Sequence, residues 1–137
     1  ELLLLNGDSL TEVALVDFCS QQRNLHSSGL VVVHQESASR FGIVQFNKDQ
    51  ELIGFMEKDA TTTSGWINAG IYYFPAGWFK NLLKQNSLPC SLEKDLIPQW
   101  LNDSCTINVF PVKGHFIDMG TPDSFAEFQL QVNLWSS

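Results

Sequence analysis

The chain has 137 residues with 15 acidic and 8 basic side chains, a formal net charge of −7, and a hydrophobic fraction of 44%. This composition excludes disordered and fibrous proteins, and the length predicts a single domain, residues 1–137, with its own core. The acidic balance argues against nucleic-acid binding, and the scattered basic residues offer no patch for a membrane surface.

The cysteines and apolar runs indicate a cytoplasmic protein. Cys19, Cys90 and Cys105 are widely spaced and form no C-x-x-C pair, so neither a disulfide framework nor a zinc site is favoured. The longest apolar runs are too short to cross a bilayer, and the first residues do not resemble a signal peptide.

The first part of the chain predicts a strand, a helix and a second strand. Residues 2–5 and 30–33 are continuous apolar runs, typical of strands buried on both faces, and residues 11–23 have helical periodicity. Such a unit implies parallel strands with a right-handed crossover. Because a central strand needs neighbours on both sides, a chain that opens in one predicts a sheet incomplete at its N-terminus.

The middle of the chain predicts a hairpin, a long strand and two helices. Residues 43–46 and 52–56 flank a polar turn, and residues 66–74 form an aromatic and β-branched run. Helices are expected at 76–84 and 91–101, the second with Ser91 as its N-cap.

The end of the chain predicts two strands, at 106–112 and 115–119, and a final helix with Thr121 as N-cap and Pro122 at its first position. An apolar stripe on this helix is expected to face the core, and it comprises Phe125, Phe128, Val132 and Trp135. The complete pattern predicts an α/β fold, a three-layer Rossmann-like sandwich with a mixed, mostly parallel sheet.

Two carboxylates follow predicted strands at points where α/β proteins place sites. Asp8 lies in the turn after the strand at 2–5, and Asp118 lies at the end of the strand at 115–119, where a helix follows. Open α/β sheets bind ligands at the carboxyl ends of strands, and two carboxylates suit a Mg²⁺ ion completed by water and substrate phosphates. The alternative is that each aspartate accepts hydrogen bonds from the backbone of its own turn.

Three further polar residues have both a structural and a functional interpretation. Glu57 and Lys58 close the second strand of the hairpin, where a solvated strand end is the simpler explanation. Asn68 lies within an apolar strand, so its amide either satisfies neighbouring backbone groups or presents donors to a polar ligand. Neither a G-x-G-x-x-G nor a G-x-x-x-x-G-K-[ST] phosphate loop occurs.

Six segments resemble, in order, those of one enzyme family. They are Leu-Leu-Asn-Gly-Asp-Ser (4–9), Arg-Phe-Gly-Ile-Val (40–44), Phe-Met-Glu-Lys (55–58), Ile-Asn-Ala-Gly-Ile-Tyr (67–72), Ser-Leu-Glu-Lys-Asp-Leu-Ile-Pro (91–98) and Phe-Ile-Asp-Met-Gly-Thr-Pro (116–122). The chain thereby resembles the sugar-phosphate nucleotidyltransferases, and most of all the bacterial heptose-1-phosphate and mannose-1-phosphate guanylyltransferases. Members join a nucleoside triphosphate and a sugar 1-phosphate into a nucleotide sugar and release pyrophosphate.

The resemblance implies a role for each candidate residue. Asp8 and Asp118 would be catalytic Mg²⁺ ligands, and Lys58 would be catalytic by neutralising the sugar phosphate. Glu57 would accept hydrogen bonds from sugar hydroxyls. The sugar pocket would also include Asn68 and the backbone of Gly42, which lacks a Cβ.

The sequence also departs from the family pattern. The G-x-G-T-R-type loop and downstream lysine that grip the triphosphate are not present. We therefore expect the chain to be the sugar- and metal-binding portion, inactive alone, with the missing segment supplied from upstream or by another chain. Whether the chain forms a homo-oligomer, which base the nucleotide carries and which sugar is bound all stay open.

Two rival interpretations remain. A non-catalytic module that binds sugar phosphates, or serves regulation or assembly, would not need the triphosphate loop. A metal-dependent glycosyltransferase is disfavoured, because Asp8 is followed by Ser9 and Leu10 rather than completing a D-x-D motif.

Overall fold

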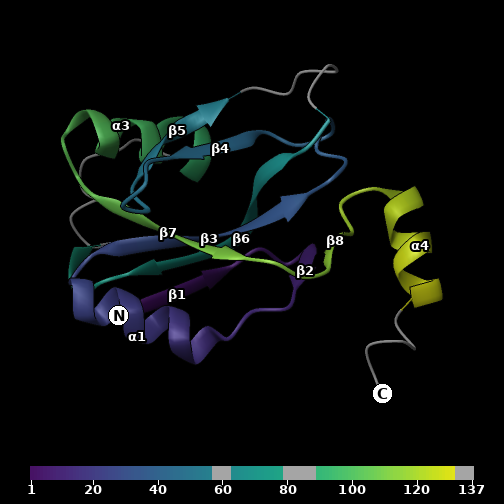
Figure 1. Cartoon of the computed structure of the whole chain (residues 1–137), viewed down its shortest axis with the longest axis horizontal. Coiled ribbons are helices and arrows are strands. Elements are labelled where there is room, and N and C mark those ends of the chain that lie inside the picture. The colour runs from purple at the N-terminus through teal and green to yellow at the C-terminus, as the bar shows by residue number, and fades with distance from the viewer. Residues whose placement is uncertain (57–62, 79–88, 132–137) are drawn as a thin grey trace.

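The computed structural model of the chain describes residues 1–56, 63–78 and 89–131, which form a main sheet, a two-stranded ribbon and several helices (Figure 1). The helix predicted at 76–84 lies largely outside the described residues. The elements in chain order are β1 (Leu2–Leu5), β2 (Ser9–Thr11), α1 (Leu15–Leu25), β3 (Ser28–Gln35), β4 (Ile43–Phe46), β5 (Leu52–Met56), β6 (Gly65–Phe74), the π-helical turn η1 (Leu92–Leu96), α3 (Ile97–Asn102), β7 (Ile107–Val112), β8 (Phe116–Asp118) and α4 (Pro122–Gln131).

The main sheet has six strands in the order β5-β4-β6-β3-β7, and β1 pairs with β6 as well. Strand β6 is antiparallel to β1, β3 and β4, whereas β3 and β7 are parallel. Among the described strands of this sheet, β1, β3, β4 and β7 therefore run in one direction. The prediction of a mixed α/β sheet is confirmed, and most strands share a direction. However, β6 separates β1 from β3, so β3–β7 is the one parallel pair in the described part.

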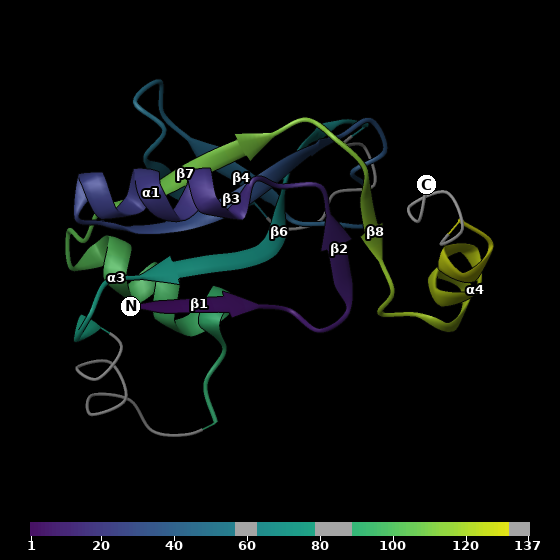
Figure 2. The ribbon, with the colours of Figure 1, turned by 90° about the horizontal axis from the view of Figure 1, so that it is seen from below.

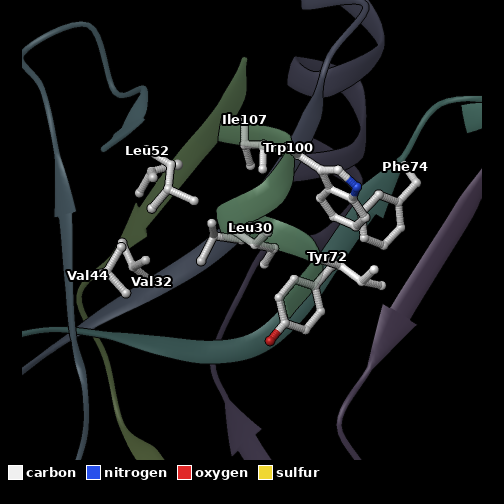
Figure 3. Packing of buried hydrophobic residues seen from close by; sticks show 11 residues of the cluster. Leu30, Val32, Val44, Leu52, Tyr72, Phe74, Trp100 and Ile107 are labelled. Atoms are coloured by element: carbon white, nitrogen blue, oxygen red, sulfur yellow. The ribbon is translucent and has the colours of Figure 1, made fainter. Parts of the chain in front are cut away.

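The sheet is the middle of three layers, with α1 on one face and η1 with α3 on the other (Figure 2). The period of two along β3 divides its side chains between the faces. Val31 and Val33 pack in the cluster that includes Phe18 of α1, whereas Leu30 and Val32 pack in the cluster with Trp100 of α3 (Figure 3). The predicted three-layer arrangement is thus present.

The first strand is less buried than predicted. Strand β1 is only partly buried, and Leu5 is 50% exposed. Its partner is β6, on one edge, and no other strand in the described residues pairs with it. Leu2 and Leu4 pack against one core cluster and Leu3 against the other, so the strand is accessible to solvent mainly along its unpaired edge.

Helix α1 begins at Leu15 rather than at residue 11, because residues 9–11 form β2, which the sequence did not predict. Its buried face includes Gln22, which is 0% exposed, whereas Leu25 at the end of the helix is exposed. Gly29 of β3 makes room for this amide, since a Cβ there would lie 2.5 Å from Gln22 Cδ. Ser27 donates a hydrogen bond to Gln22 Oε1.

The helix predicted at 91–101 begins as the π-helical turn η1 and continues as α3. The Ser91 N-cap is confirmed, because its hydroxyl accepts a hydrogen bond from the Lys94 N–H at 3.2 Å. The Ile97 N–H donates to the Leu92 carbonyl five residues back. Pro98 follows without an N–H and cannot continue the bonding pattern of an α-helix at that position, which accommodates the wider turn.

The final helix starts as predicted but does not pack into the core. The Ser124 N–H donates to Thr121 Oγ1, which confirms the N-cap. Helix α4 lies beyond β8, outside the three layers (Figures 1 and 2), and Phe125 is 47% exposed. The predicted core-facing stripe is therefore wrong for Phe125, because α1, η1 and α3 already cover the sheet; Val132 and Trp135 lie outside the described residues.

None of the helices in the described residues is long and apolar enough to cross a membrane.

Replacing Phe18 with alanine should destabilise the chain by about 3–5 kcal/mol, the usual cost of truncating a buried aromatic residue. Phe18 is fully buried and its ring centroid lies 5.5 Å from that of Phe110. Urea denaturation measures the change, with Val16→Ala as the matched control on the same helix, since Val16 is 77% exposed. Equal effects of the two substitutions would show that α1 does not pack on the sheet through Phe18.

Candidate functional site

A cavity of about 910 Å³ opens between the β2–β8 ribbon, strand β5 and the turn η1. Four residues that the sequence singled out line it together, namely Asp8, Gly42, Asn68 and Asp118. Glu57 and Lys58 lie outside the described residues, and the preceding Met56 lines the cavity.

The β2–β8 ribbon brings Asp8 and Asp118 to the same place. Strand β2 pairs antiparallel with β8, with Ser9 opposite Asp118. The pairing extends one step further, since the Met119 N–H donates to the Asp8 carbonyl at 2.7 Å. A backbone ribbon therefore fixes the spacing of two carboxylates that are far apart in the sequence.

Gly120 marks the point where the two carboxylates converge. A Cβ on Gly120 would lie 3.1 Å from Asp118 Oδ1 and 3.5 Å from Asp8 Oδ2. The Gly120 N–H also donates to Asp118 Oδ1 at 3.0 Å, so the structural interpretation of Asp118 as a turn aspartate is correct for that oxygen. Gly120 thus leaves open the space between the carboxylates and helps to orient one of them.

The donor set fits a hard cation that keeps part of its water shell. In the described ranges no group of three or more His, Cys, Asp or Glu residues could hold a metal ion. Mg²⁺ does not require such a cage, because it is usually bound by one or two carboxylates together with water and substrate phosphates. The chemistry of Asp8 and Asp118 therefore suits Mg²⁺ better than zinc, which prefers nitrogen and sulfur ligands.

Asn68 lies in an apolar strand, but its side chain contacts polar groups. Its Nδ2 group donates to the Tyr72 hydroxyl at 2.6 Å and to Glu93 Oε1 at 2.7 Å. Its Oδ1 accepts the Gly70 N–H at 2.9 Å, and the Tyr72 hydroxyl donates to Glu93 Oε1 at 2.8 Å. Asn68 lines the cavity, but both Nδ2 and Oδ1 of its side chain are already hydrogen-bonded within the protein.

Glu93 is the cavity residue that sequence reasoning missed. It lies on η1 and lines the cavity with its neighbour Lys94. The sequence predicted a helix at 91–101 around it and assigned Glu93 no role in a site. Its contact with Asn68 joins residues 25 positions apart, so no local pattern could have indicated the pair.

Gly70 shapes the side of the cavity formed by β6. Its φ of +73° is one that residues with a Cβ rarely adopt, and a Cβ there would lie 2.6 Å from Asn6 Nδ2. The Asn6 N–H donates to the Gly70 carbonyl at 2.8 Å, which holds the segment before Asp8 against β6. The β3–β6 register shifts between Leu30 and Val32, at this irregularity in β6. Such irregularities are common beside active sites.

Comparison with known proteins identifies the group to which this fold and cavity belong. The family model described as "Nucleotidyl transferase" matches residues 1–133, nearly the whole chain. The chain belongs to this family.

Two curated members of the nucleotidyl transferase family illustrate the extent of the similarity. The glucose-1-phosphate adenylyltransferase of Geobacillus stearothermophilus is 30% identical over 96% of the chain, and that of Halalkalibacterium halodurans is 29% identical over 96%. The chain covers 36% of the length of each. It thus spans about a third of these curated relatives.

A solved structure supports the fold. The chain matches HddC from Yersinia pseudotuberculosis with a TM-score of 0.75 and 24% identity, over 91% of this chain and 52% of HddC. The same protein complexed with GMP-PN matches with a TM-score of 0.73. The likeness shows that the chain and HddC share a fold. Whether the chain is nearest to guanylyltransferases stays a prediction.

Gly70→Ala should destabilise this member of the nucleotidyl transferase family more than Gly77→Ala does. Both glycines have positive φ, for which a Cβ costs about 1–2 kcal/mol. At Gly77 a Cβ would meet nothing within 4 Å, whereas at Gly70 it would also displace Asn6. Urea denaturation gives the free energy of unfolding of each variant. The Gly77 variant measures the effect of positive φ alone, and the Gly70 variant adds the contact with Asn6. Equal decreases in the two variants would show that Asn6 does not restrict position 70.

Proposed function

We propose that the chain is the sugar-phosphate- and metal-binding portion of a sugar-1-phosphate nucleotidyltransferase. The observation that carries this proposal is the convergence of Asp8 and Asp118 at the edge of a cavity of about 910 Å³. Membership of the nucleotidyl transferase family and the names of the curated relatives support it.

In the proposed reaction an oxygen of the sugar 1-phosphate attacks the α-phosphorus of a nucleoside triphosphate. The new bond gives the nucleotide sugar, and the bond to the β-phosphate breaks so that pyrophosphate leaves. Such phosphoryl chemistry needs chiefly positioning and neutralisation of charge. Mg²⁺ would supply a cation that neutralises the phosphate oxygens. Asp8 and Asp118 would hold it, with the ribbon that carries them keeping their spacing fixed.

The remaining roles are also proposals. Lys58 neutralises the sugar phosphate and Glu57 accepts hydrogen bonds from the sugar, as the family resemblance implies, although both lie outside the described residues. Gly42 lines the cavity, and a Cβ there would lie 3.3 Å from the Met56 carbonyl oxygen. Its position on the cavity wall supports close approach of a sugar to its backbone.

The substrates follow from the same reasoning. The curated relatives are named for glucose 1-phosphate, which supports a hexose or heptose 1-phosphate as the sugar substrate. A nucleoside triphosphate is its partner, Mg²⁺ is the metal, and the protein acts in nucleotide-sugar biosynthesis in the cytoplasm. The triphosphate-binding loop of the family would come from outside these 137 residues, so turnover is expected of a longer protein.

Calorimetry with glucose 1-phosphate and mannose 1-phosphate tests this function on the chain itself. We expect binding that MgCl₂ strengthens, because Asp8 and Asp118 would hold the cation and the cation would neutralise charge on the phosphate. Asp8→Asn and Asp118→Asn should each abolish the increase in affinity that MgCl₂ produces. We expect that increase to be about 10- to 100-fold, the usual effect of a charged partner. An asparagine at 118 keeps an acceptor oxygen for the Gly120 N–H, so the turn is preserved.

Asp17→Asn is the control, since Asp17 is an exposed carboxylate on α1 outside the cavity. It should leave both affinities unchanged. No binding of either sugar phosphate to the wild-type chain would overturn the proposed function. A normal Mg²⁺ response in either cavity variant would remove that aspartate from the metal site.

Lys58→Ala should weaken the affinity for sugar 1-phosphates by about 10-fold or more, since it removes a cation paired with phosphate. Lys48→Ala is the matched control, because Lys48 is exposed in the turn between β4 and β5. Direct binding measurements with both variants decide the matter. Equal affinities would count against the role of Lys58 while leaving the two aspartates untouched.

A further inference from the structure

We propose that Glu93 recognises hydroxyl groups of the sugar in this cavity and that Asn68 and Tyr72 position its carboxylate for that task. The inference rests on the proposed function, because it concerns the sugar that the cavity binds. It assigns the direct contact with the sugar to Glu93 rather than to Asn68.

The first support is a hydrogen-bond network in which every member is used. The Gly70 N–H donates to Asn68 Oδ1, and the two N–H groups of Asn68 suffice for its contacts with Tyr72 and Glu93. The Tyr72 hydroxyl accepts from Asn68 and donates to Glu93 Oε1. Oε1 thus receives two hydrogen bonds of 2.7 and 2.8 Å, which fix the carboxylate's position relative to β6.

The second support is the rigid base of this network. The Tyr72 ring is 2% exposed and belongs to the cluster of Phe74 and Trp100, while its hydroxyl points away from those two rings (Figure 3). Burial, followed by the charge of Glu93, raises the pKa of Tyr72, so the hydroxyl stays a donor well into the alkaline range. The core therefore holds a donor at the cavity wall.

The third support is the local structure that carries Glu93. The N-terminal end of η1 is fixed beside it, because the Ser91 hydroxyl accepts the Lys94 N–H and the Ser91 N–H donates to Asp95 Oδ2 at 2.6 Å. Single π-helical turns are rare and occur frequently at functional sites. Asp95 is thus used in a cap, whereas Glu93 lines the cavity.

The chemistry of the free oxygen identifies the part of the ligand that it meets. Glu93 Oε2 receives no hydrogen bond from the residues that the structure describes, and an ionised carboxylate can only accept. It repels phosphate and favours neutral O–H donors, and a carboxylate can take two adjacent hydroxyls. A sugar offers such donors at the end of the molecule away from its phosphate.

Glu93→Gln tests the inference with little change in shape. Glutamine keeps an Oε1 acceptor for Asn68 and Tyr72 but replaces the second acceptor with a donor and removes the charge. We expect the affinity for glucose 1-phosphate to fall by about 10- to 100-fold, the usual effect of losing a charge-assisted hydrogen bond. The affinity for inorganic phosphate should stay unchanged.

Singly deoxygenated glucose 1-phosphates provide the readout that a merely structural role would not change. An analogue that lacks a hydroxyl bound by Glu93 should lose less affinity on Glu93→Gln than glucose 1-phosphate does, whereas the other analogues should lose as much. The matched control is Glu36→Gln, because Glu36 is exposed and does not line the cavity. Calorimetry or competition with inorganic phosphate measures all of these affinities.

Tyr72→Phe tests the positioning part separately. It should reduce glucose 1-phosphate affinity less than Glu93→Gln does, and the two losses should not add in the double variant, because Tyr72 acts through Glu93. Equal losses for glucose 1-phosphate and inorganic phosphate, or no loss at all in Glu93→Gln, would overturn the inference while leaving the proposed function intact. Failure of the wild-type chain to bind any sugar phosphate would instead overturn the proposed function.

Discussion

The pairing of β6 with three strands is the constraint on which the rest of the structure depends. One edge of β6 pairs with β3, while β4 and β1 pair with it near its beginning and its end. Alternate residues of β6 pack in the two core clusters, with Tyr73 facing α1 and Tyr72 facing α3. Loss of this strand would therefore remove both cores and the wall of the cavity together.

The same strand connects stability to the proposed chemistry. Asn68, Gly70 and Tyr72 share one face of β6, and each has a different role there. Tyr72 anchors the row in the core, Gly70 leaves room for Asn6, and Asn68 reaches Glu93. The cavity is thus an extension of the packed sheet, which suits a site that must hold polar groups at fixed distances.

The sequence could predict those parts of the site that depend on local signals. Asp8 and Asp118 each follow a strand, and strand ends are recognisable from apolar runs and turn residues, so their meeting in one cavity was foreseeable. The role of Glu93 could not be predicted, because it depends on a contact with Asn68 that only the tertiary fold creates. Strand β2 was missed, since three residues with one apolar side chain carry no periodic signal, whereas its partner β8 lies within the strand predicted at 115–119. In α4 the periodicity correctly gave a helix, but an apolar stripe cannot say whether a neighbour covers it.

The net charge of −7 acquires a physical meaning from the arrangement of the cavity. Three carboxylates, Asp8, Glu93 and Asp118, line a space proposed to receive phosphates and outnumber the basic residues Arg40 and Lys94 on the same wall, so without a metal ion the carboxylates would oppose phosphate binding. Two converge near Gly120, where a shared cation would reverse the local charge. The third is held separately by Asn68 and Tyr72, where hydroxyls rather than phosphates are suitable partners. Under the proposed function such a cavity would orient a sugar phosphate, because a cation held by Asp8 and Asp118 would attract the phosphate end and Glu93 would accept hydrogen bonds only from the hydroxyl end.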